Sequence, residues 1–231
     1  KEMGIKSIDL LGPKEWATAS KHGLTCAMAY ASDVPLIKGF NDPALHDKLL
    51  KDYSENIPKA AEAGLNNVIC FSGNTNGLTA AQGIENCARG LEPVLKIAAR
   101  YKVTVTMELL NSRVDHHDYQ CDHTAWGVQL CEKLGSDAFK LLYDIYHMQR
   151  NEGDIVANID RCWEEIGYIQ IGDNPGRNEP TTGEINFKNI FRHIHSKGYQ
   201  GILGMEHGIA RPGKEGELAL IQAYRESDSF M

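Results

Sequence analysis

The 231-residue sequence contains no apolar run close to the roughly 18 residues that cross a bilayer, which argues against a membrane-spanning protein. Basic residues are also scarce: 24 lysines and arginines face 31 acidic residues, for a net charge of −7. Broad binding of nucleic acid or of an anionic membrane needs a basic face, so neither partner is expected. The chain can still hold a local basic pocket for a small anion.

The six cysteines form no CxxC pair and no tight framework of spacings. This pattern favours reduced structural thiols and a cytoplasmic protein. The chain begins with Lys1 and not with methionine, so a secreted or periplasmic form stays open.

No glycine-rich phosphate loop follows the first predicted strand, which removes the best evidence for a nucleotide-binding sheet. Short apolar runs instead alternate with longer stretches of helical periodicity. The predicted strands are 6–11, 24–30, 66–73, 103–110, 139–146, 166–172 and 201–207. The predicted helices are 13–22, 43–63, 79–101, 122–134, 154–165, 187–197 and 214–226.

Strict alternation of strand and helix predicts an α/β fold with parallel strands, and we favour a TIM (β/α)₈ barrel over an open sheet. The sequence predicts seven strands where such a barrel has eight. We therefore expect a single barrel domain over residues 1–231 that is N-terminally incomplete, with its first strand upstream of Lys1.

Four side chains that suit a hard cation stand where apolar strands end. They are Glu108 in VTVTMELLN, Asp144 in KLLYDIYHMQ, Gln170 in GYIQIGD and Glu206 in ILGMEHG. Their separations are 36, 26 and 36 positions, each about one strand-plus-helix unit. Three carboxylates and an amide at one rim of a barrel form a typical set of oxygen ligands for a hard divalent cation.

Strand parity supports this interpretation, because each of the four shares the inward face of its strand. Thr106 and Glu108 alternate with Val105 and Met107, which would face the helices. The alternative is a set of hydrogen-bonded polar side chains that close the barrel mouth. Clustered buried carboxylates repel one another unless a cation or protons intervene, which favours the metal.

The segment YDIYHMQRNEGDIVANIDRCWEEIGYIQIGDNPGRNEPTTGEINF closely resembles the hydroxypyruvate isomerase family of xylose-isomerase-like TIM barrels. MELLNSRVDHHDYQCDHTAWG and ILGMEHG extend the similarity over most of residues 66–208. The resemblance implies a metal-dependent isomerase that interconverts hydroxypyruvate and tartronate semialdehyde by enediolate proton transfer. It also implies that the four strand-end residues hold one Mg²⁺ or Mn²⁺.

By the same resemblance, Glu108 and Glu206 are the predicted catalytic groups, and which of them is the essential base stays open. His147 is predicted to hydrogen-bond a substrate oxygen, and Arg177 to clamp a substrate carboxylate. The histidine-rich segment DHHDYQCDH is expected to be a lid or dimer contact and not a second metal site.

The first alternative function is a ketose 3-epimerase acting on a free or phosphorylated sugar, and the second is a non-catalytic sugar-binding barrel. The expected partner is a small hydroxy-keto acid or sugar. The sequence leaves open whether the protein forms a homo-oligomer.

Overall fold

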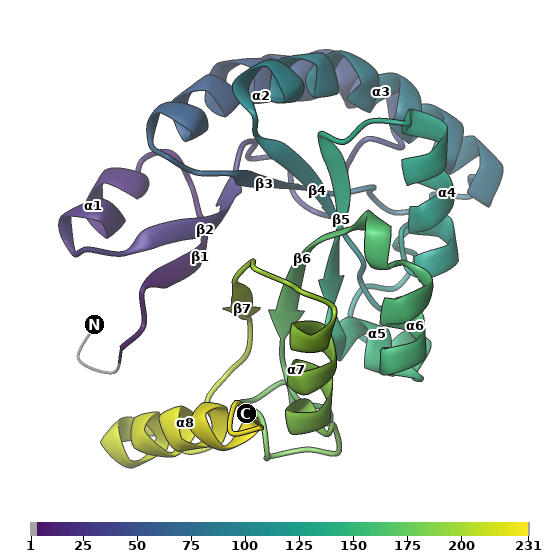
Figure 1. Cartoon of the computed structure of the whole chain (residues 1–231). Helices are drawn as coiled ribbons and strands as arrows, with labels where there is room; N and C mark the ends of the chain where they lie inside the picture. The colour runs from purple at the N-terminus through teal and green to yellow at the C-terminus, as the bar shows by residue number, and fades with distance from the viewer. Residues whose placement is uncertain (1–3, 231) are drawn as a thin grey trace.

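The computed structural model describes residues 4–230 and places their seven strands in one parallel sheet, in chain order from β1 to β7 (Figure 1). The strands are β1 Ser7–Leu11, β2 Thr25–Tyr30, β3 Asn67–Cys70, β4 Thr104–Glu108, β5 Phe139–Asp144, β6 Ile166–Ile171 and β7 Leu203–Met205. The sheet curves into a nearly closed barrel with helices outside it, which confirms the predicted barrel architecture. An additional strand before β1 remains a prediction.

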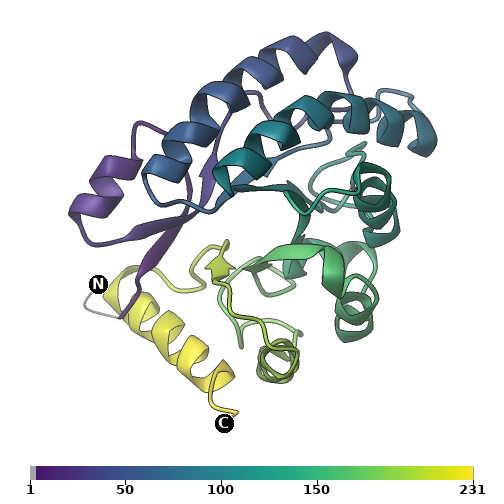
Figure 2. The same ribbon diagram turned by 45° about the horizontal axis from the view of Figure 1, so that its top comes forward.

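The helices follow the strands along the chain and cover the outside of the barrel. They are α1 Trp16–Lys21, α2 His46–Glu62, α3 Ala80–Tyr101, α4 Thr124–Leu134, α5 Ile145–Asn151, α6 Ile155–Arg161, α7 Phe187–Ser196 and α8 Gly213–Ser227. Helices α2 and α3 pack side by side on one side of the barrel, and α8 lies on the opposite side next to α7 (Figures 1 and 2). No helix within residues 4–230 is both long and apolar enough to cross a membrane.

Local signals set several helix ends. Helix α3 begins at a capping box, in which the Thr79 side chain accepts from the backbone of Gln82 and the Gln82 side chain accepts from the backbone of Thr79. Helix α4 ends at Gly135, whose φ of 53° is the left-handed conformation that glycine adopts at low cost.

The hydrophobic core has two parts. The larger part lies between the sheet and the helices, and the smaller fills the inside of the barrel. The inner part contains Met28, Ile69, Leu142 and Tyr168, and the buried Thr106 hydroxyl approaches the Met28 sulfur at 3.3 Å. Leu142 and Tyr168 lie on the faces of Asp144 and Gln170 that were predicted to point inward, which agrees with the strand parity of β5 and β6. The inner residues form a packed floor below the rim.

Several sequence-based boundaries need correction. The predicted strands 66–73 and 103–110 end at Cys70 and Glu108, and the predicted helix 154–165 ends at Arg161, before a 3₁₀ turn at Trp163–Glu165. The predicted strand 139–146 ends at Asp144, because the chain there turns into helix α5, which the sequence reading did not separate. Asp144 is the N-cap of that helix. The predicted strand 201–207 forms a ladder only over Leu203–Met205.

Strands β1 and β7 are the two ends of the sheet order and share no ladder among residues 4–230. A groove of about 420 Å³ lies along them and is lined by Ile8, Leu203 and Met205 among others. We call this junction of β1 and β7 the seam. Ile8 and Met205 expose 38% and 40% of their surface there, whereas the centres of β3 to β6 are buried.

Candidate active site

Two of the four predicted ligands stand on neighbouring strands, at the rim where both strands end. Glu108 is the last residue of β4 and pairs in register with Leu142, two residues before Asp144 at the end of β5. Both side chains are buried, with 4% and 0% of the residue surface exposed. One Asp144 oxygen, Oδ1, accepts the His147 backbone N–H at 3.0 Å as a helix cap. The other oxygen, Oδ2, is left to face the site.

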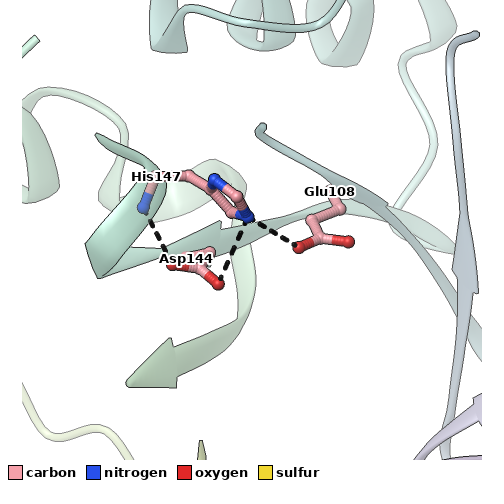
Figure 3. A group of neighbouring side chains, drawn as sticks. All are labelled: Glu108, Asp144 and His147. Atoms are coloured by element: carbon pink, nitrogen blue, oxygen red, sulfur yellow. Dashed lines mark hydrogen bonds and ion pairs between the residues drawn. The ribbon is translucent and has the colours of Figure 1, made fainter. Parts of the chain in front are cut away.

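His147 comes from the first turn of α5 and points back at these two carboxylates (Figure 3). Its Nε2 lies 4.0 Å from Glu108 Oε1 and 3.9 Å from Asp144 Oδ2. Among residues 4–230, these three form the one group of histidine, cysteine and carboxylate side chains whose atoms are close enough together to hold a metal.

Gln170 continues the rim on β6, where it pairs in register with Asp144. Its side chain is fully buried, and its Nε2 donates to Asp9 Oδ2 of β1 at 3.5 Å. Asp9 also accepts the Tyr168 hydroxyl at 2.8 Å. With the amide nitrogen on Asp9, the Gln170 Oε1 is buried and has no hydrogen-bond partner within the described residues.

Glu206 directly follows β7, and its backbone N–H donates to Ile171 O of β6 at 3.0 Å. Arg177, in the loop after β6, joins Glu206 to Asp144. Its Nη2 lies 3.0 Å from Asp144 Oδ2 and 3.2 Å from Glu206 Oε1, and its guanidinium lies over the ring of Tyr146. The structure therefore brings Glu108, Asp144, His147, Arg177 and Glu206 into one connected cluster, with Gln170 adjacent on the strand between β5 and β7.

Burial of so many charges displaces their pKa values. Burial raises the pKa of Glu108 well above its usual value, and the charges of Glu206 and Asp144 raise it further against the lowering effect of Arg177. Burial, followed by the charge of Asp144, raises the pKa of Glu206 to about 7 although Arg177 opposes it. A carboxyl whose pKa lies near neutrality can both accept and return a proton, as general acid–base catalysis requires.

His147 shows the opposite displacement, since burial lowers its pKa to about 4 despite the nearby charge of Asp144. Burial alone would lower the pKa of Arg177 as well, but the charges of Asp144, Glu206 and Glu108 outweigh it and raise the pKa. The site thus holds a neutral imidazole, a guanidinium cation and carboxyl groups that repel one another.

The polar atoms of the rim fit a divalent cation. Several buried atoms of the rim cluster have no hydrogen-bond partner within the described residues, namely Oε1 of Glu108, Oε1 of Gln170, Oε2 of Glu206, Nε2 of His147 and Nε of Arg177. Buried polar atoms are rarely left unpaired, so such a group needs an explanation. The three oxygens, together with Asp144 Oδ2, are the donor types that Mg²⁺ and Mn²⁺ bind.

Other sequence-based expectations also have an outcome. The segment DHHDYQCDH lies at the rim, where the ring of His116 packs edge-on against that of His147 at 5.1 Å. All six cysteines are free, and five of them are buried. His207 stacks on Tyr224 of α8, with its Nε2 2.7 Å from the Tyr224 hydroxyl oxygen, and so faces outward, away from the rim cluster.

The sequence reading missed three polar residues that support the site. Asp9 orients Gln170, Asn111 contacts the His147 ring, and the buried Asp173 holds the arginine loop by accepting backbone N–H groups of Gly183 and Ile185. Asn111 and Asp173 follow a predicted strand by three or fewer positions, and that location was the one available signal.

A groove of about 750 Å³ opens at the rim between the loops that follow β1 and β2. Its floor includes Leu10, Tyr30 and Phe71, which also pack on the inner core. Burial and the charges of Glu108 and Glu206 raise the pKa of Tyr30 to about 12. The residues that line this groove do not include those of the rim cluster.

With this fold and site in place, comparison with known proteins defines the class. Residues 14–227 match the family model described as xylose isomerase-like TIM barrel, so the chain belongs to that family. A solved 3-keto-D-glucoside 4-epimerase from E. coli superposes with a TM-score of 0.80 at 19% identity, covering 98% of this chain and 90% of that one. At this identity the likeness shows the shared fold.

Two curated relatives are more similar in sequence. The hydroxypyruvate isomerase of Escherichia coli K12 is 34% identical over 154 residues, which is 65% of this chain and 58% of that protein. The 2-oxo-tetronate isomerase of Cupriavidus necator is 35% identical over 127 residues, which is 55% of this chain and 48% of that protein. The chain thus spans about half of the length of the curated relatives it matches.

Proposed function

We propose that the protein is a divalent-metal-dependent isomerase that interconverts hydroxypyruvate and tartronate semialdehyde. The observation that carries this proposal is the rim cluster itself. Glu108, Gln170 and Glu206 each have a buried side-chain oxygen without a hydrogen-bond partner within the described residues, and the pKa of Glu206 is raised to about 7. The two relatives named as isomerases of small keto acids support the choice of substrate class.

Glu108, Asp144, Gln170 and Glu206 would hold one Mg²⁺ or Mn²⁺. When bound, the cation supplies a Lewis acid that stabilises negative charge on the substrate oxygens. The site residues account for the rest of the chemistry.

The reaction moves one carbon-bound proton. A glutamate takes a proton from C3 of hydroxypyruvate, and the electron pair of that C–H bond forms an enediolate across C2 and C3. The protonated glutamate or its partner returns a proton to C2, while the hydroxyl proton passes from the C3 oxygen to the C2 oxygen, so atoms and charge balance. Glu206 and Glu108 are the two groups with raised pKa values that can serve this exchange.

Arg177 and His147 are the two side chains that would position the substrate. The Nε of Arg177 has no partner within the described residues, so it can donate to the substrate carboxylate without breaking the contacts of Nη2. His147 Nε2 points between Glu108 and Asp144, in reach of a substrate oxygen held there.

The second candidate is a ketose 3-epimerase, which would use the same pair of glutamates on a longer substrate. The observation in its favour is the groove of about 750 Å³ between the loops that follow β1 and β2, beside Tyr30, whose pKa is raised by burial and by the charges of Glu108 and Glu206; a polyol chain longer than a three-carbon acid would extend into it.

The test is turnover of hydroxypyruvate by metal-stripped protein, with and without Mg²⁺ or Mn²⁺. We expect activity only with metal, its loss in Glu206→Gln and its retention in the matched control Glu92→Gln, which alters an exposed glutamate paired with Lys96 on α3. A folded protein that is inactive with every metal contradicts the hydroxypyruvate assignment, and activity on a panel of ketoses would then favour epimerisation.

A further inference from the structure

Asn111 lies three residues beyond Glu108, is fully buried and makes hydrogen bonds with both ends of its amide. Its Oδ1 accepts the backbone N–H groups of Val114 at 3.2 Å and Asp115 at 3.0 Å. Its Nδ2 donates to Asp115 Oδ2 at 2.7 Å. Backbone N–H groups can only donate, so turning the amide around would set donors against donors. The orientation of this side chain is therefore fixed by its surroundings.

The second hydrogen of Asn111 Nδ2 points at His147, whose Nδ1 lies 2.6 Å away. An amide nitrogen has no lone pair to offer, so His147 Nδ1 must accept. A neutral imidazole that accepts at one nitrogen carries its proton on the other. A doubly protonated ring would place two donors against each other at this short distance.

We propose that Asn111 is a positioning residue that holds His147 as its Nε2–H tautomer, so that His147 donates a hydrogen bond to a substrate oxygen and does not bind the cation. The substrate half of this inference rests on the proposed function. The tautomer itself rests on the contacts of Asn111 alone.

The contact differs from the usual arrangement around a metal-binding histidine. Such a histidine donates its second ring N–H to a carboxylate, carbonyl or water, which leaves a lone pair for the metal. Here the second nitrogen faces a donor, and the proton on Nε2 is directed between Glu108 Oε1 and Asp144 Oδ2. Within the group of Glu108, Asp144 and His147, the two carboxylates therefore bind the cation and His147 donates a hydrogen bond. Gln170 and Glu206 provide the other cation ligands.

The direct test exchanges the two side chains. In Asn111→Asp with Asp115→Asn, the new carboxylate accepts the same two backbone N–H groups and the new amide. It then also requires a proton on His147 Nδ1. Total charge is unchanged. Asp115 Oδ2 accepts both Asn111 Nδ2 and the Tyr146 hydroxyl, at 2.7 and 2.9 Å, so the amide nitrogen that replaces it would donate to the new carboxylate and to the Tyr146 oxygen, which can accept as well as donate. The matched control is Asp115→Asn alone, which leaves the donor of Asn111 in place.

The readout is the ring tautomer, from two-bond proton–nitrogen NMR spectra of histidine-labelled, metal-free protein. His147→Gln identifies the signal among nine histidines. We expect the proton on Nε2 in the wild type and in Asp115→Asn, and on Nδ1 in the exchanged variant. We also expect kcat to fall by about a hundredfold in the exchanged variant, with KM changing far less, as for loss of one transition-state donor.

A wild-type spectrum with the proton on Nδ1 would overturn the inference even if the exchanged variant did not fold. An unchanged tautomer in a folded exchanged variant, or an equal loss of kcat in Asp115→Asn, would overturn it too. A proton on Nε2 in a protein that turns over neither hydroxypyruvate nor ketoses would support the tautomer and contradict the proposed function, so the two failures are separable.

Discussion

The two sides of the rim differ in how firmly they hold their polar residues. On the side of β4 to β6, Glu108, Asp144 and Gln170 are almost completely buried, and β5 continues into a helix that Asp144 itself caps. On the seam side, Glu206 follows a strand of three residues, and its side chain is 26% exposed. The first side is built for fixed ligands. The second has the solvent access that a group exchanging protons needs.

The largest effect, on metal affinity, is expected at the buried residues of β4 to β6. Asp144→Asn keeps an oxygen to cap α5 but removes the charge, so Mn²⁺ affinity should fall by about a hundredfold or more with little loss of thermal stability. Asp144→Ala should lose the cap as well, at a further cost of about 1 kcal/mol in the free energy of unfolding. Titration calorimetry and thermal melts measure both quantities. Asp137→Asn, at an exposed position, is the control, and equal Mn²⁺ binding by it and Asp144→Asn would refute the assignment.

The two neighbouring leucines of β5 separate the inner core from the outer core. Leu141 packs outward against the helices, Leu142 packs inward below the rim, and both are fully buried. Each change to Ala should cost about 3 kcal/mol in urea unfolding, because each leaves a cavity. Only Leu142→Ala should also lower kcat in the folded protein, since it removes the floor of the site. A similar fall in kcat for Leu141→Ala would show that the inner core does not position the ligands separately.

The pH dependence of stability tests the seam-side glutamate. Glu206 has a folded pKa of about 7 against an ordinary value of 4.5, so between these limits the folded metal-free protein binds more protons than the unfolded chain. The contribution of Glu206 to the free energy of unfolding should therefore fall as pH rises from about 4.5 to 7, on the order of 1–3 kcal/mol, and Glu108 has a shift of the same sign. His147, whose pKa burial lowers to about 4, contributes in the opposite direction, so the Glu206 contribution is the difference between the wild type and Glu206→Gln.

Mn²⁺ should reverse that slope, because the ion binds the deprotonated carboxylates and releases protons. Urea unfolding over this pH range, with and without Mn²⁺, measures the effect. Relative to the wild type, Glu206→Gln should lose the component that falls with pH in the metal-free protein, and Glu92→Gln should not. A metal-free curve for Glu206→Gln with the same pH dependence as the wild type would contradict the raised pKa.

The smallest effect is expected at the seam surface. Ile8→Thr and Met205→Gln alter side chains that are already 38% and 40% exposed, so each should change the free energy of unfolding by no more than about 0.5 kcal/mol. Urea denaturation provides the value. A loss as large as that of Leu142→Ala would mean that these side chains are covered in solution.

Alternation of apolar runs predicted the order of strands and helices, and period-two parity predicted which side chains face inward. Helix α5 was missed because Asp144 belongs both to an apolar strand and to a helix cap, and the short run YHMQ carries too few turns to show helical periodicity. The roles of Asp9 and Asn111 depend on contacts with Gln170 and His147 that are 161 and 36 positions away, and no local pattern encodes them.

The most direct test of the central claim is a crystal structure of the Mn²⁺-loaded protein with anomalous diffraction at the manganese edge. We expect one ion bonded to Glu108, Asp144, Gln170 and Glu206, with His147 Nε2 outside bonding distance. An ion bonded to His147, or held away from these four strand ends, would contradict it.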